Sequence, residues 1–120
     1  MIVQVSPAHF AAWRSEASST NAGAAPVVLD VREPWELQTA SFAPDGFTLL
    51  HVPMQSIPAH LAELQTNYSA DQPIACLCHH GVRSQQVAMF LAQHGFTDVV
   101  NLQGGIAAWA QLLDPSIPQY

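Results

Sequence analysis

The sequence predicts an α/β domain built on a five-stranded, mainly parallel sheet. Short runs rich in apolar and β-branched residues alternate with segments whose apolar residues recur at helical spacing. Such alternation is typical of strands joined by crossover helices. In addition, VVLDV at residues 27–31 is apolar except for one aspartate, as expected of a parallel strand covered on both faces.

The length and charge of the chain limit what it can be. Its 120 residues suit a single domain, and a hydrophobic content of 49% argues against disorder. The net charge is −6, with three arginines and no lysine, so we expect no nucleic-acid partner. We see neither a signal peptide nor an apolar run near the roughly 20 residues that span a bilayer. The sequence therefore predicts a cytoplasmic protein without a membrane partner.

The first elements follow from local patterns. IVQV at residues 2–5 is typical of a strand, and Ser6 followed by Pro7 is typical of a helix start. Apolar residues then recur at helical spacing up to residue 17, and the small polar residues 18–26 predict a surface loop before the second strand.

The middle of the chain is expected to contain a short helix over residues 34–39, a turn at PDG and a third strand over 48–52. Ser56 can cap the short helix that follows. The second half is expected to contain a strand, a helix, a strand, a helix and a tail, over residues 73–77, 84–95, 99–102, 104–113 and 114–120. Gly95 is expected to end the longer helix. The chain is thus predicted to be one domain with a core over about residues 2–113.

Cys78 is the strongest candidate for a reactive group. It lies at the end of a predicted strand, and reactive sites of parallel sheets lie beyond the carboxyl ends of the strands. Gly81 allows the following loop to turn its N–H groups inward, while Arg83 and the start of the next helix add positive potential. Such surroundings favour a thiolate, and we expect Cys78 to be a nucleophile that carries an anionic adduct.

Three blocks of the sequence resemble the rhodanese-type sulfurtransferase family. CHHGVRS (78–84) is similar to the family's loop Cys-x-x-Gly-x-Arg-Ser/Thr, DVREPWE (30–36) to Asp-Val-Arg-x-x-x-Glu, and LQGGIAAW (102–109) to Gly-Gly-x-x-x-Trp. The resemblance covers the whole chain and implies the rhodanese-like fold, a central sheet with helices on both faces. Where many members have His-Ile-x-Gly-Ala, this chain has SFAPDGFTLLHVPM (41–54).

The resemblance also implies a reaction. Cys78 takes a sulfane sulfur from thiosulfate or another persulfide donor, forms a persulfide, and passes the sulfur to cyanide or a thiol, including that of a protein partner. Arg83 steers the anionic donor and holds the shape of the loop. No cofactor is expected, because the intermediate is covalent. The residues implied to surround the outer sulfur are His79, His80, Gly81, Val82, Arg83 and Ser84.

Other interpretations of the neighbouring residues stay open. Two histidines beside two cysteines suit zinc or copper, but the spacing is unusual for a structural zinc site, so no metal is expected. His79 and His80 either fill the loop or add positive charge when they titrate near about pH 6.5. Cys76 is expected to pack in the core.

Asp30 and Arg32 are expected to support the site structurally. A buried aspartate at a strand end usually accepts hydrogen bonds from the neighbouring backbone, and Arg32 is expected to pair with Glu33 or Glu36.

Two other functions are compatible with these residues. One is a phosphatase or arsenate reductase, but the loops of those enzymes have Cys-x5-Arg, one residue longer than Cys78 to Arg83. The other is a sulfur carrier or interaction module for a protein partner. The presence of Cys78 favours an enzyme over an inert module.

Overall fold

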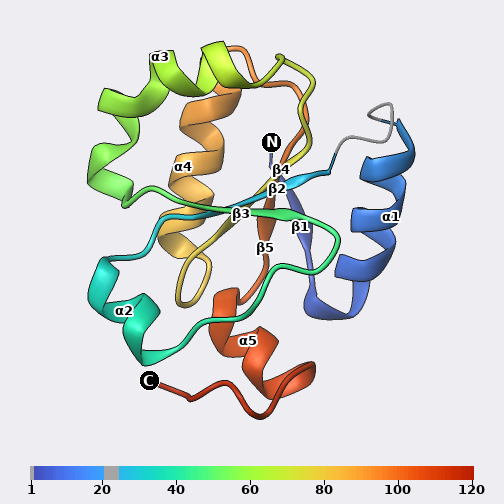
Figure 1. Cartoon of the computed structure of the whole chain (residues 1–120), viewed down its shortest axis with the longest axis vertical. Helices are drawn as coiled ribbons and strands as arrows, with labels where there is room; N and C mark the ends of the chain where they lie inside the picture. Colours follow the sequence, from blue (N-terminus) through green and yellow to red (C-terminus); the bar gives the residue numbers. More distant parts are fainter. Residues whose placement is uncertain (1, 21–24) are drawn as a thin grey trace.

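The computed structural model describes residues 2–20 and 25–120, which form a central sheet flanked by helices (Figure 1). The strands are β1 (Val3–Val5), β2 (Val27–Asp30), β3 (Thr48–His51), β4 (Ile74–Leu77) and β5 (Val99–Leu102). All neighbouring strands pair in parallel, in the order β1-β5-β4-β2-β3. The predicted five-stranded sheet is confirmed, and β4 is its central strand.

The helices are α1 (Phe10–Thr20), α2 (Pro34–Thr39), α3 (Ile57–Asn67), α4 (Val82–Gln93) and α5 (Gly105–Leu112), with short 3-10 helices η1 (Pro7–His9) and η2 (Met54–Ser56). The helix predicted over residues 34–39 has those bounds. α4 begins before Ser84, because Gly81 takes a left-handed φ of 98° and turns the chain directly into the helix. Of the loop predicted over 18–26, the start is helical and residues 21–24 lie outside the described residues.

The two predicted serine caps occupy the expected N-cap positions but do not form the expected hydrogen bonds. Ser6 precedes η1 and Ser56 precedes α3, yet neither side chain makes a cap hydrogen bond. The Ser6 hydroxyl instead lies 2.7 Å from Nδ1 of His9. Gly95 does follow α4 in the left-handed conformation, with φ 101°, as predicted.

Helices cover both faces of the sheet (Figure 1). One core cluster joins α3 and α4 to the sheet, and its helical members are Ile57, Leu64, Val87, Ala88 and Leu91. The other joins α1 and α5, through Phe10, Ile106 and Ala110. Neighbouring residues of β4 point alternately to the two clusters, Cys76 to the first and Leu77 to the second. The central strand is therefore buried along its whole length.

The predicted tail packs against the domain. Ile117 is 5% exposed and belongs to the second cluster, and Tyr120 contacts the residues around Arg32 and Glu36. Ile117 and Tyr120 thus attach the segment 114–120 to the domain.

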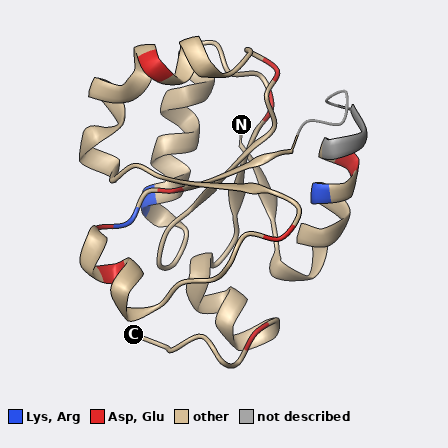
Figure 2. Cartoon of the chain, viewed as in Figure 1, with Lys and Arg blue, Asp and Glu red and all other residues tan. Residues whose placement is uncertain are grey.

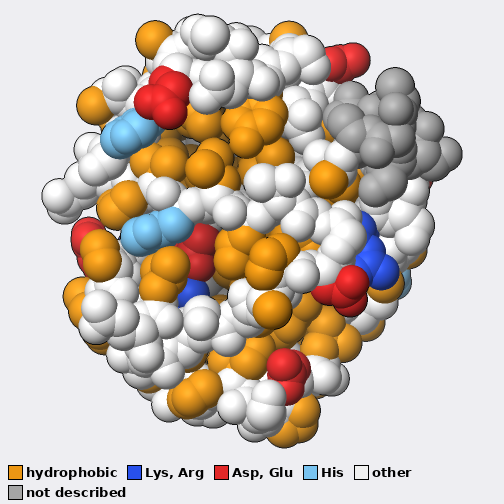
Figure 3. Space-filling model, in the orientation of Figure 1, with side chains coloured by type: hydrophobic (Ala, Val, Ile, Leu, Met, Phe, Trp, Pro, Cys, Tyr) orange, Lys and Arg blue, Asp and Glu red, His pale blue; other side chains and the backbone are white. Residues whose placement is uncertain are grey.

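Charged side chains are sparse on this fold. Arg14 lies on α1, whereas Arg32 and Arg83 lie near α2 and the start of α4 (Figure 2). On the face drawn in Figure 3, hydrophobic side chains are widespread and charged ones are isolated or in small groups. Among the described residues, no helix has both the length and the apolar character needed to cross a membrane.

Candidate functional site

The carboxyl ends of three adjacent strands meet at Cys78. The cysteine follows β4 directly and is 1% exposed. β2 pairs with β4 on one side and ends at Asp30, while β5 pairs with it on the other side and carries Asn101 near its end. This edge of a parallel sheet is where the sequence predicts the reactive group.

The sulfur of Cys78 lies inside the turn that leads into α4. It accepts hydrogen bonds from the backbone N–H groups of Gly81, at 3.1 Å, and Ser84, at 3.4 Å. The hydroxyl oxygen of Ser84 lies 3.3 Å from the sulfur. Two amide N–H groups and the positive end of the helix dipole therefore face the sulfur, and these groups can accommodate negative charge at that position.

Arg83 is bound by a carboxylate. Its Nη1 and Nη2 donate to the two carboxylate oxygens of Glu36, at 2.7 and 2.8 Å. These hydrogen bonds hold the pKa of Glu36 well below its ordinary value of 4.5, at about 2, and raise the pKa of Arg83. Glu36 also accepts from the backbone N–H of Glu33 at 2.8 Å, which completes a capping box at the start of α2. The ion pair connects the loop after Cys78 to α2.

Arg32 pairs with Asp30, so the expected pairing with Glu33 or Glu36 is wrong. Its Nε and Nη2 donate to the Asp30 carboxylate at 3.0 and 2.8 Å, and its backbone N–H donates at 3.1 Å. The Glu36 carboxylate is already occupied by Arg83, while Asp30 faces Arg32 from the end of β2. Arg32 is fully buried and also donates to the carbonyl of Ala40 at 2.8 Å. These contacts connect the end of β2 to the segment that contains α2, and the supporting role of Asp30 and Arg32 stays a prediction.

The two loop histidines form a stack with Tyr120. The ring centroids of His79 and His80 lie 3.9 Å apart, and those of His79 and Tyr120 lie 3.8 Å apart and nearly parallel. Burial lowers the pKa of His79, and the neighbouring His80 lowers it further. Of the two interpretations given to these histidines, the structure favours loop filling for His79.

The Tyr120 hydroxyl connects the two ion pairs. It accepts from Nη1 of Arg32 at 3.1 Å and donates to Oε1 of Glu36 at 2.9 Å. One side chain thus links Asp30–Arg32 to Glu36–Arg83.

Cys76 is part of the core, as predicted. It is fully buried in the cluster beneath α3 and α4, and it forms no disulfide. Burial raises the pKa of the Cys76 thiol, and the neighbouring Cys78 adds to the effect. Cys76 therefore stays a neutral thiol.

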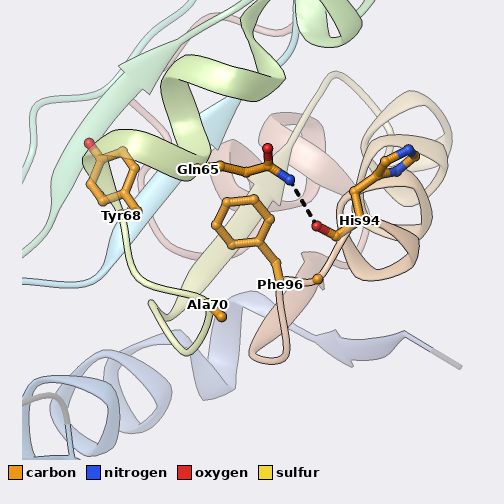
Figure 4. Close-up of a pocket in the computed structure, with 6 residues that line it drawn as sticks. Gln65, Tyr68, Ala70, His94 and Phe96 are labelled. Atoms are coloured by element: carbon orange, nitrogen blue, oxygen red, sulfur yellow. Dashed lines mark hydrogen bonds between the residues drawn. The ribbon is translucent and has the colours of Figure 1, made fainter.

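Away from Cys78, the described residues contain a surface pocket but no evident metal site. No group of three or more histidine, cysteine or acidic side chains is placed to hold a metal ion in this part of the chain. A surface pocket of about 250 Å³ is lined by Gln65, Tyr68, Ala70, His94, Gly95 and Phe96, and the Gln65 amide donates to the His94 carbonyl there at 3.1 Å (Figure 4). This pocket lies near the start of β4, at the opposite end of the sheet from Cys78.

The sequence did not predict the contacts that several residues make around the loop. Glu36 is the last residue of the DVREPWE block, so its place in that motif was the available signal. Asn101 and Gln4 lie in strands with no distinguishing pattern, and Tyr120 lies in the predicted tail. Their roles depend on contacts between distant parts of the chain.

Known proteins resemble this chain in sequence and structure. The family model described as "rhodanese-like domain" matches residues 14–112. A sulfurtransferase from Allochromatium vinosum is 35% identical, over 71% of this chain and 72% of that protein. Thiosulfate sulfurtransferase GlpE from Pseudoalteromonas translucida is also 35% identical, over 69% of this chain and 71% of that protein.

A longer relative and a solved structure match as well. A chloroplastic rhodanese-like/PpiC domain-containing protein 12 from Arabidopsis thaliana is 37% identical, and the match spans only 30% of its length. A crystal structure of a rhodanese-related protein from Thermoplasma volcanium superposes with a TM-score of 0.69 and 27% identity, over 98% of this chain and 99% of that one.

Proposed function

The chain belongs to the rhodanese-like domain family, and from this premise we propose that it is a sulfurtransferase that works through a persulfide of Cys78. The supporting observation is the position of the sulfur, which accepts two backbone N–H groups at the start of α4. Those donors stabilise the thiolate before reaction, and the surrounding loop can hold an anionic outer sulfur after it.

The proposed reaction has two displacement steps. The Cys78 thiolate attacks the outer sulfur of thiosulfate, the S–S bond of the donor breaks, and sulfite leaves with the electron pair. The product is a persulfide anion on Cys78. A thiophilic acceptor, either cyanide or a thiolate, then attacks the terminal sulfur and restores the Cys78 thiolate.

The ion pair with Glu36 also argues against phosphate chemistry. A phosphatase needs its arginine to bind the equatorial oxygens of the substrate, whereas both terminal nitrogens of Arg83 donate to Glu36. The loop also has one residue fewer than the Cys-x5-Arg loops. Both features favour a substrate that adds a single sulfur atom to Cys78.

Intact-mass measurement after incubation with thiosulfate tests the proposal. We expect the protein to gain one sulfur atom and to lose it when cyanide is added. Cys76→Ala should retain the gain, and Cys78→Ser should not show it. Absence of any gain with thiosulfate and with an inorganic polysulfide would contradict a persulfide mechanism. So would hydrolysis of p-nitrophenyl phosphate at a rate comparable to thiosulfate turnover.

Replacement of Arg83 with alanine is expected to lower sulfur transfer at least about tenfold, because misplaced catalytic groups reduce rates steeply. The defect should be the same at low and high ionic strength, since Glu36 neutralises the Arg83 charge at 2.7 Å. Arg14→Ala is the matched control, because Arg14 pairs with Asp45 away from the loop. A defect that changes strongly with salt would instead mean that Arg83 steers the donor by its charge.

A further inference from the structure

Asn101 lies behind the reactive loop and contacts groups from three parts of the chain. It is 3% exposed. Its Nδ2 donates to the carbonyl of Gly81 at 3.0 Å and to Oε1 of Gln4 at 2.9 Å. Its Oδ1 lies 2.5 Å from the hydroxyl oxygen of Ser84. Because the Gly81 carbonyl can only accept, the nitrogen of the amide must face it, and the amide oxygen therefore faces Ser84.

The Ser84 hydroxyl has two neighbours but only one proton. Its oxygen lies 2.5 Å from Oδ1 of Asn101 and 3.3 Å from the sulfur of Cys78. An amide oxygen is an acceptor only, so the proton lies between Ser84 and Asn101. The hydroxyl then presents a lone pair to the sulfur. That lone pair accepts the proton of a thiol but does not stabilise a thiolate.

We propose that Asn101 is a positioning residue that keeps the Ser84 hydroxyl proton away from the Cys78 sulfur. The inference rests on the proposed function, because it concerns the nucleophile of that reaction. The thiolate receives the backbone N–H groups of Gly81 and Ser84 but not the hydroxyl. Since the nucleophilicity of a thiolate falls as the thiolate becomes more stable, Asn101 preserves the nucleophilicity of the Cys78 thiolate.

Alkylation by iodoacetamide across a range of pH tests this proposal, with Cys76→Ala as the background so that one thiol remains. Asn101→Leu removes the amide at similar volume and frees the hydroxyl to donate to the thiolate. We expect the pH midpoint of alkylation to fall by about one unit, the size of one hydrogen bond to a charged group. The plateau rate at high pH should fall about threefold, because the more stable thiolate is less nucleophilic.

Ser84→Ala separates this effect from a general disturbance of the site, and it keeps the backbone N–H that faces Cys78. We expect no rise of the midpoint in Ser84→Ala and no further shift when Asn101→Leu is added to it. Asn67→Leu, at an exposed position of α3, is the assay control, and thermal unfolding checks that each variant is folded. If Asn101→Leu does not fold, the pH midpoint of alkylation in Ser84→Ala still tests the proposal, because a raised midpoint would show that the hydroxyl donates to the thiolate.

Three results would overturn the proposal: an unchanged midpoint in folded Asn101→Leu, a raised midpoint in Ser84→Ala, or an Asn101→Leu shift that persists without the hydroxyl. Alkylation does not require sulfur transfer. A failure to gain sulfur from thiosulfate would therefore count against the proposed function while leaving the midpoints able to decide the role of Asn101.

Discussion

Replacement of Glu36 with glutamine is expected to reduce sulfur transfer about 100-fold, the scale on which a misplaced catalytic group lowers a rate. The carboxylate is 4% exposed and binds both terminal nitrogens of Arg83. Glutamine offers one oxygen and no charge, so the connection between the loop and α2 is weakened. We also expect the free energy of unfolding to fall by about 2 kcal/mol at neutral pH, less than for a fully buried ion pair because the Arg83 side chain is 34% exposed to solvent.

The pH dependence of this loss identifies its cause. Folding lowers the pKa of Glu36 from 4.5 to about 2, so the carboxylate contributes its full stability above pH 4.5 and loses it as the pH falls toward 2. The difference in unfolding free energy between wild type and Glu36→Gln should shrink over that interval, as measured by denaturant titration. Glu63→Gln, at an exposed position of α3, is the control. A difference that stays constant across the interval would show that the ion pair is not responsible.

Replacement of Gly105 with alanine is expected to destabilise the protein by at least about 3 kcal/mol, because it combines overpacking with backbone strain. Gly105 begins α5 at a φ of 62°, and an added Cβ would collide with the carbonyl oxygens of Cys78 and His79. Those carbonyls accept hydrogen bonds from Ile106, at 2.9 Å, and Ala107, at 3.1 Å. The start of α5 thus contacts the loop after Cys78 directly. The alanine methyl group would push α5 and this loop apart.

Gly95→Ala is the matched control for this prediction. Gly95 has a φ of 101°, but an added Cβ would have nothing within 4 Å. It should therefore cost about 1 kcal/mol from backbone strain alone and leave sulfur transfer unchanged. Thermal or denaturant unfolding measures the stabilities, and thiosulfate turnover measures the activities. Equal losses of stability in the two variants would refute the proposed contact between α5 and the loop.

The fold was predictable because its signals are local. All five strands fall within or close to the predicted ranges, since each buried strand is a short apolar run that ends at a polar residue or a turn. The place of Cys78 followed from the same reasoning, because a parallel sheet brings the carboxyl ends of its strands to one edge. Gly81 was recognisable because a tight turn around a sulfur requires a left-handed residue.

The support of the loop was not predictable in the same way. Nothing near Arg32 in the sequence distinguishes three possible carboxylate partners, and only the folded chain shows that Asp30 pairs with Arg32 while Glu36 pairs with Arg83. Asn101 looks like one polar residue in an apolar strand until β5 is placed beside β4. Tyr120 lies beyond the last predicted helix, and only the folded chain returns it to α2.

The contacts that fix the loop have a consequence for the order of folding. Asn101 and Gln4 are 97 residues apart in sequence, and Tyr120 and Glu36 are 84 residues apart. Closing such long loops costs conformational entropy, so we expect these contacts to form after the local turns and helices. The turn around Cys78 is local. The contacts that hold it in place also need β1 paired with β5 and residues 114–120 packed against the domain. The hydrogen-bonded surroundings of the Cys78 sulfur are therefore a property of the complete domain and not of the local turn alone.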